Sequence, residues 1–251
     1  MRLGTFNVLG LTGYPPQFPA GALAAEPERV AHFAAVFAGL GCDVLALQEG
    51  PDPATMRRIA ERLGAGLAAF PSPSAYPGYI LSRLAIRESR VYAHMGPGGR
   101  DGPFSRSAGA ALLGAPGAEP LWVVAVHLHP SDAGLRLRET GLLAAHLDRL
   151  DGPAVVLGDF NSEVGEPVHA MLQARGFVHA ALRAGRRIEA TMDTAGVRPR
   201  AIDHIYVDAR MAGRVASARV VRDEGFRADA QAPGRWVHSD HLPVTADLAE
   251  P

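Results

Sequence analysis

Apolar positions along the chain follow two different spacings, and the change from one to the other predicts the order of strands and helices. Residues 2–8, RLGTFNV, predict a first strand, and residues 27–41 carry apolar side chains every three or four positions, which predicts a helix. A second run at 43–49 predicts a strand, and helical spacing through 56–63 predicts another helix. The chain therefore begins with two pairs of a strand and a helix.

The rest of the chain mixes consecutive strands with helices. Strands are predicted at 78–86, 106–114, 120–128, 155–158, 201–207, 214–221 and 242–248, and helices from about 135 to 150 and near 169–175. Such mixed runs indicate sheets packed together with helices outside. The chain of 251 residues is 47% hydrophobic, which is ample for a sizeable core, and no linker divides it, so we expect one domain over residues 1–251.

One predicted strand ends in an acid and an amide. Val155, Val156 and Leu157 lead to Asp159 and Asn161 in the stretch VVLGDFNSEVGEP. In an extended chain, residues two apart point to the same side, so both polar side chains are expected to face one point while residue 160 enters the core. The alternative is an Asx-type turn, in which both side chains bond only to nearby backbone.

Polar residues recur at the ends of the other predicted strands, as expected of a built site. They are Asn7, Glu49, His127, Asp159 with Asn161, Asp203 with His204, and Asp240 with His241. The carboxylates of Glu49, Asp159 and Asp240 are suitable oxygen ligands for a hard cation, so Mg²⁺ or Mn²⁺ is the expected cofactor. Zinc is the lesser alternative, because one cysteine and scattered histidines do not form a clear zinc ligand set.

Composition excludes some classes of protein. The net charge is −1, so the electrostatic field of the whole protein does not favour binding to nucleic acid or to an anionic membrane. All 25 basic residues are arginine. Cys42 is the only cysteine, which excludes an intrachain disulfide. No apolar segment of 18 residues and no signal-like N-terminus is present, so we expect a cytoplasmic protein without stable membrane association or an obligate protein partner. Whether a signal peptide was removed from the protein is left open.

Six motifs in order carry a family resemblance. They are TFNV, LALQE, VAVHLHPSDA, GDFNS, AIDHIYV and HSDHLPV, and they resemble the endonuclease/exonuclease/phosphatase superfamily of metal-dependent phosphoesterases over residues 3–244. The resemblance implies an α/β fold like that of DNase I, a four-layer sandwich of two packed β-sheets with helices on the outer faces and the site at one end. Calcineurin-like phosphoesterases also contain a Gly-Asp pair like the one that opens GDFNS, but their GNH and GHxH motifs are missing from this sequence.

The resemblance also implies a role for each motif residue. The implied metal ligands are Glu49, Asn7 and Asp240, with Glu49 as the principal one. Asp159 would orient or deprotonate the attacking water, which Asn161 would hold together with a phosphate oxygen. His241 would contact the phosphate while Asp203 holds its ring, and His127 would donate to a phosphate oxygen. Whether Asp159 or His241 is the general base stays open.

The loops between the motifs bear on the substrate. Residues 13–27 are proline-rich, 94–106 are glycine-rich, and 183–200 contain five arginines, of which Arg186 and Arg187 are candidates for binding a second phosphate. A solvated basic loop is the alternative. Aromatic residues make up only 6% of the chain and do not alternate with basic ones, so small or varied phosphodiesters are the expected substrates. A DNA or RNA nuclease is the alternative, followed by a sphingomyelinase-like or inositol-phosphate phosphatase and, last, a non-catalytic binding protein.

Overall fold

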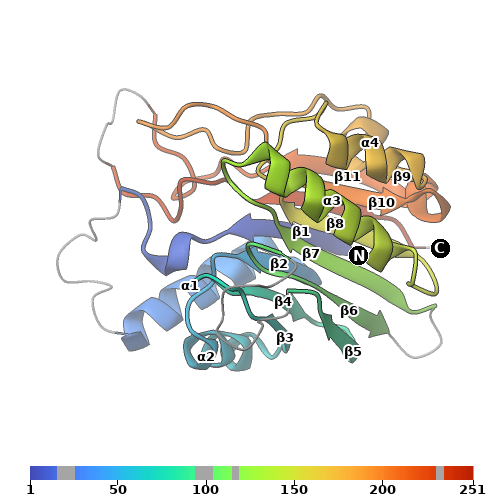
Figure 1. The fold of residues 1–251 in the computed structure, drawn as a ribbon. Coiled ribbons are helices and arrows are strands. Elements are labelled where there is room, and N and C mark those ends of the chain that lie inside the picture. The colour runs from blue at the N-terminus through green and yellow to red at the C-terminus, as the bar shows by residue number, and fades with distance from the viewer. Residues whose placement is uncertain (16–25, 94–103, 115–118, 230–234, 251) are drawn as a thin grey trace.

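The computed structural model describes residues 1–15, 26–93, 104–114, 119–229 and 235–250, which form two six-stranded mixed β-sheets (Figure 1). The strands of the first sheet are, in spatial order, β11 (Val215–Val220), β12 (Val244–Leu248), β1 (Arg2–Asn7), β2 (Val44–Gln48), β4 (Gly78–Ser82) and β3 (Gly66–Phe70). Those of the second sheet are β5 (Ala85–Val91), β6 (Ala108–Gly114), β7 (Leu121–His127), β8 (Ala154–Asp159), β10 (Asp203–Asp208) and β9 (Phe177–His179).

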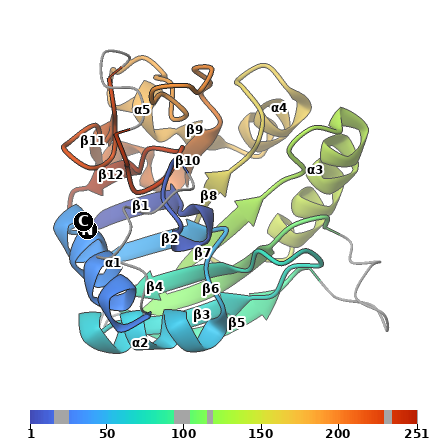
Figure 2. The ribbon, with the colours of Figure 1, turned by 90° about the vertical axis from the view of Figure 1, so that its left-hand side faces the viewer.

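Helices cover the outer face of each sheet (Figure 2). The helices are α1 (Glu26–Leu40), α2 (Pro53–Leu63), α3 (Ala133–Leu147), α4 (Pro167–Ala174) and α5 (Ala180–Arg183), with short 3-10 helices η1 (Leu9–Leu11) and η2 (Ala209–Arg214). Figure 2 shows α1 and α2 on one side of the two sheets and α3 and α4 on the other. The predicted α/β four-layer sandwich is therefore confirmed. No helix within the described ranges is long and apolar enough to cross a membrane.

Strand β8 shows why the central strands are apolar throughout. Val155 and Leu157 lie in the core between the sheets, whereas Val156 lies in the core under α3 and α4. Neighbouring side chains of a strand point to opposite faces, and both faces of this sheet are covered, so both need apolar residues. A third core, which includes Phe6 of β1, packs against α1 and α2.

The parallel strand pairs bring the predicted polar ends together. Strand β1 pairs with β2 in parallel, with Asn7 beside Gln48, and β7 pairs with β8 in parallel, with His127 beside Asp159. Strand β10 runs antiparallel to β8 and begins at Asp203, opposite Asp159. All these residues therefore lie at one end of the sandwich.

The structure differs from the predicted elements at residues 78–86. They form two strands instead of one, because the chain turns after Ser82 and β4 and β5 join different sheets. Ser82 Oγ accepts the Leu84 N–H at 3.0 Å and donates to the Leu84 carbonyl at 2.8 Å, which holds the turn. Strands β3 and β9 and helix α5 were not predicted. Most of the proline-rich and glycine-rich loops, residues 16–25 and 94–103, lies outside the described residues.

Candidate active site

Asp159, the last residue of β8, is the hub of the site. Asn7 Nδ2 donates to its Oδ2 at 3.0 Å. The Nε2 atoms of His127 and His241 lie 3.6 and 3.8 Å from the same oxygen. Only 1% of Asp159 is exposed, so these groups surround a carboxylate that is almost entirely removed from solvent. Side chains from both sheets thus converge on a single oxygen atom.

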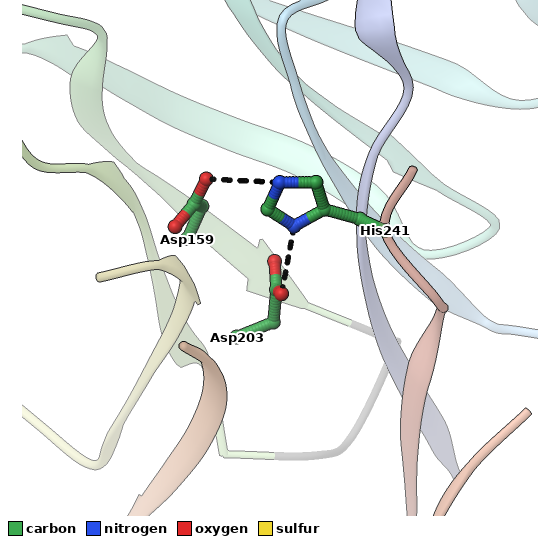
Figure 3. Close-up of side chains that lie close together, drawn as sticks. All are labelled: Asp159, Asp203 and His241. Carbon is green, nitrogen blue, oxygen red and sulfur yellow. Dashed lines mark hydrogen bonds and ion pairs between the residues drawn. The ribbon is translucent and has the colours of Figure 1, made fainter. Parts of the chain in front are cut away.

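His241 lies between two carboxylates (Figure 3). Its Nδ1 is 2.9 Å from Asp203 Oδ2, and its Nε2 faces Asp159. Asp203 Oδ2 also accepts the Thr191 hydroxyl at 2.6 Å, and Thr191 Oγ1 accepts the backbone N–H groups of Ile202 and Asp203, each at 3.1 Å. Burial by itself would lower the pKa of His241, but the charges of Asp203 and Asp159 outweigh it and raise the pKa to about 10. The imidazole is therefore held as a cation in a fixed orientation.

Asn161 does not continue the extended chain that its spacing from Asp159 suggested. Its φ is 49°, and its N–H donates to Asp159 Oδ1 at 2.9 Å, which is the Asx-type turn considered as the alternative. Its Nδ2 donates to the Leu128 carbonyl at 3.0 Å. Phe160 is buried, as expected. The turn therefore occupies one oxygen of Asp159 and leaves Oδ2 facing the site.

Glu49 follows β2 directly and lies beside Asn7 and Asp159. Its φ of 51° is a left-handed conformation that a glutamate rarely adopts, and such strain concentrates at functional sites. Asn7 Nδ2 lies 3.3 Å from Glu49 Oε1, while Asn7 Oδ1 accepts the N–H of Leu9 at 3.2 Å. Burial raises the pKa of Glu49, and the charges of Asp159 and Asp240 raise it further.

This excess of negative charge fits a divalent cation. Glu49, Asp159 and half-buried Asp240 offer the hard oxygen ligands that Mg²⁺ and Mn²⁺ prefer. In this arrangement Asn7 presents its amide nitrogen to the carboxylates, so an Asn7 ligand would require the amide to turn. Asp159, Asp203 and His241 also lie close enough to hold a metal, with one possible ligand atom of each within 4.8 Å of the others. We disfavour that position because His241 Nδ1 is already hydrogen-bonded to Asp203.

His127 is a neutral hydrogen-bonding group in this site. Burial lowers its pKa to about 4. Its Nδ1 has no hydrogen-bond partner among the described residues, whereas Nε2 lies 3.9 Å from Glu49 Oε1 and 3.6 Å from Asp159 Oδ2. A buried donor without an acceptor is costly, so the proton is best placed on Nε2, where it points into the site.

A second polar network lies beneath the turn after Asp159, and of its histidines the sequence analysis singled out only His204. The N–H of Ala181 bonds to His179 Nδ1 at 3.2 Å, so His179 Nε2 carries the proton and donates to His204 Nδ1 at 3.1 Å. His204 Nε2 then donates to the Ser162 carbonyl at 3.0 Å. Burial lowers the pKa of His179 to about 4 and that of His204 as well. Two neutral histidines therefore support the segment that carries Asn161.

In the described part of the chain, the predicted substrate arginines form no hydrogen bond or ion pair with the residues of this hub. Arg186 and Arg187 are exposed, and Arg187 lines a small pocket with Ile188 and Val220 that Asp203 also borders. Arg200, which was not singled out, lies nearer, with Nη2 3.4 Å from the Asn161 carbonyl. The structure thus brings together all eight predicted catalytic and metal residues, and of the two predicted arginines only Arg187 shares a pocket with one of them, Asp203.

Comparison with known proteins identifies the family. Residues 4–241 match the Endonuclease/Exonuclease/phosphatase family, whereas no curated protein matches the chain. Among solved structures, a mannosyl-6-phosphatase from Bacteroides thetaiotaomicron VPI-5482 is similar at 16% identity and a TM-score of 0.77, with 100% of each chain covered. A 3'-5' exonuclease from Neisseria meningitidis is 21% identical with a TM-score of 0.69, again over 100% of each chain. A protein of unknown function from Enterococcus faecalis V583 is 20% identical with a TM-score of 0.76 and the same coverage. The likeness to these structures supports the fold, and the family match over nearly the whole length shows that the chain belongs to the endonuclease/exonuclease/phosphatase family, whose members are hydrolases.

Proposed function

We propose that the protein is a divalent-metal-dependent phosphoesterase that hydrolyses small or varied phosphodiesters by attack of an activated water. The observation that carries the proposal is the convergence of Asn7, His127 and His241 on Asp159 Oδ2. Cleavage of a phosphodiester needs a positioned nucleophile, neutralised phosphate oxygens and a proton source for the leaving alkoxide. The hub has a candidate group for each of these tasks.

Glu49 and Asp240 are the proposed ligands of Mg²⁺ or Mn²⁺, with Asn7 orienting Glu49 or joining it as a ligand. The bound ion would neutralise charge on the nonbridging phosphate oxygens. The Ser239 hydroxyl supports this arrangement, because it donates to the Asn7 carbonyl at 2.7 Å and lies 3.4 Å from Asp240 Oδ1. It thereby links the loop that carries Asp240 to the end of β1.

Asp159 is the proposed general base, and His241 the proposed phosphate-binding cation and proton donor. Asp203 and Asp159 flank the imidazole of His241 on both nitrogens, an arrangement that keeps it charged. An imidazolium cannot accept the proton of the water, whereas the Oδ2 of Asp159 can. His127 would donate from Nε2 to a phosphate oxygen, and Asn161 would hold the water together with Asp159.

The experiment that tests this function is hydrolysis of bis(p-nitrophenyl) phosphate by the purified protein after exhaustive chelation and after addition of Mg²⁺ or Mn²⁺. We expect no turnover without metal and recovery with either ion, because the carboxylate cluster alone repels the phosphate. Full activity in the chelated protein would contradict metal dependence. No activity with any tested metal on any phosphoester would contradict the proposed function.

A nuclease is the second candidate, because one similar structure is an exonuclease and another is a Neisseria 3' phosphatase bound to a product DNA hairpin. The mannosyl-6-phosphatase has the same fold, so the fold alone does not distinguish a nuclease from an enzyme that acts on small phosphoesters. The net charge of −1 favours the small substrate. Salt dependence separates the two, since a nuclease that neutralises several phosphates loses about 0.9 log units of affinity per log of salt for each one.

A further inference from the structure

A groove lies between the beginnings of α3 and α4, next to the loops that leave the active site. Its volume is about 460 Å³, within the range of roughly 300 to 1,000 Å³ that is typical of small-molecule sites. The lining residues are Ala133, Gly134, Arg136, Leu137 and Thr140 of α3, and Glu166, Pro167 and Val168 around the start of α4. The groove is therefore large enough for an organic group of a substrate.

The polar side chains of the groove are already paired. Arg136 forms a salt bridge with Glu166 at 2.9 Å and donates to the His129 carbonyl at 3.0 Å, and its side chain is only 11% exposed. The Thr140 hydroxyl donates to the Arg136 carbonyl at 2.8 Å. The surface that remains for a ligand is thus apolar, and it suits a hydrocarbon group better than a second phosphate.

One large apolar side chain of the groove is exposed. Leu137, which lines the groove, is 57% exposed. It is one of four large hydrophobic residues found exposed in the described part of the chain; the others are Tyr76, Val164 and Leu182, none of which lines the groove. Ligand sites are concave and lined mainly by hydrophobic side chains, so Leu137 is placed to contact an apolar group.

Two short segments connect the groove to the catalytic residues. One runs from His127 at the end of β7 to the start of α3, the other from Asp159 at the end of β8 to the start of α4, and Asn161 Nδ2 joins them by donating to the Leu128 carbonyl. Arg136, which lines the groove, donates to the His129 carbonyl of the first segment, and Oε2 of buried Glu139 accepts the His129 N–H at 2.9 Å. An ester group that extends from a phosphate at Asp159 along these segments would lead toward the groove.

We infer that this groove binds an apolar ester substituent of the substrate, so that the preferred substrates are phosphodiesters with a hydrocarbon group next to the phosphate. The inference rests on the proposed function. Full burial of one methylene is worth about a fourfold gain in affinity, and a groove open on one side gives roughly half of that free energy, or about twofold. This gain in affinity should appear as a higher kcat/KM for longer ester groups, and it should depend on Leu137.

The test uses alkyl p-nitrophenyl phosphates from methyl to hexyl, which share one leaving group. With metal present, kcat/KM of the wild type should rise about twofold per methylene over the first few carbons, and Leu137→Ser should flatten the series. The control is Leu182→Ser, which alters another leucine that is 52% exposed on α5 but does not line the groove. A flat wild-type series, or the same rise in Leu137→Ser, would overturn the inference.

A binding measurement separates this inference from the proposed function. In metal-free protein, the Leu137 methyl NMR signals should shift on addition of the hexyl ester and should not shift with the methyl ester. If no ester is hydrolysed but this shift occurs, the proposed function is wrong and the groove is still a binding site. If the methyl ester is hydrolysed and no shift occurs, only the groove inference is wrong.

Discussion

The contact between Asp203 and His241 gives the sharpest prediction for a single substitution. Asp203→Asn removes the charge that faces His241 Nδ1 at 2.9 Å, where the side chains of the pair are 0% and 7% exposed. A hydrogen bond between charged groups contributes about 1.5–3 kcal/mol. Each 1.36 kcal/mol is a factor of ten in rate, so kcat should fall by about 10- to 150-fold if the charged, oriented imidazole acts in the transition state.

The assay is the initial rate of bis(p-nitrophenyl) phosphate hydrolysis at saturating metal, with kcat and KM determined separately. The matched control is Asp208→Asn at the other end of β10, where the carboxylate pairs with Arg210 at the surface instead of with the site. Urea unfolding of both variants checks that the fold persists. Wild-type kcat in Asp203→Asn, or an equal loss in Asp208→Asn, would refute the role of Asp203 in holding His241.

Four further predictions concern metal binding, proton transfer, pH and substrate recognition. Glu49→Gln should raise the Mg²⁺ concentration needed for half-maximal activity by at least tenfold while the urea midpoint stays near that of the wild type; an insoluble variant would indicate a structural carboxylate. Asp159→Asn and His241→Ala should each lower kcat by about 10² to 10⁴, and the double variant should lose far less than the product, whereas additive losses would indicate independent roles. Burial lowers the pKa of His179 from 6.5 to about 4. As the pH falls below 6.5, the unfolded chain takes up a proton at this histidine while the folded protein keeps it neutral. The contribution of His179 to stability is therefore present above pH 6.5 and is lost as the pH falls toward 4. The free energy of unfolding should therefore fall between pH 7 and 5, and His179→Gln, which keeps a donor for His204, should reduce that fall by about 2 kcal/mol; an unchanged pH dependence would contradict the assignment. Arg186→Ala with Arg187→Ala should leave hydrolysis of small diesters unchanged at low and physiological salt, and a loss confined to DNA would assign these exposed arginines to nucleic-acid recognition.

The local pattern predicted packed sheets with helices outside and polar residues at the strand ends, whereas the family resemblance implied the four-layer order and the site at one end. An apolar strand such as β8 shows burial on both faces, and the polar residues that follow such strands must meet where parallel strands end together. The turn at Ser82 was missed because the apolar pattern continues through it, although the two strands join different sheets. Strand β3 was missed because Gly66–Phe70 has small residues and no clear alternation.

Contacts made by distant segments were harder to foresee. Thr191 lies 12 residues before Asp203 and is not in any motif, yet its hydroxyl is one of the two donors to Asp203 Oδ2. The extended conformation expected from Asp159 to Asn161 was wrong, because the backbone enters a left-handed turn at Asn161, as the alternative of an Asx-type turn had it. Arg186 and Arg187 were selected for their charge, which does not determine where their side chains lie relative to the site. These features depend on tertiary packing, and short-range spacing does not determine it.

The most direct test of the central claim is hydrolysis of a phosphodiester in oxygen-18-labelled water with Mg²⁺ or Mn²⁺. If water activated at Asp159 attacks phosphorus, mass spectrometry should find one labelled oxygen in the phosphate monoester product and none in the released alcohol or phenol. Asp159→Asn should form this labelled product at least about 100-fold more slowly. Label in the alcohol or phenol, or an equal rate of labelled product from Asp159→Asn, would contradict the account.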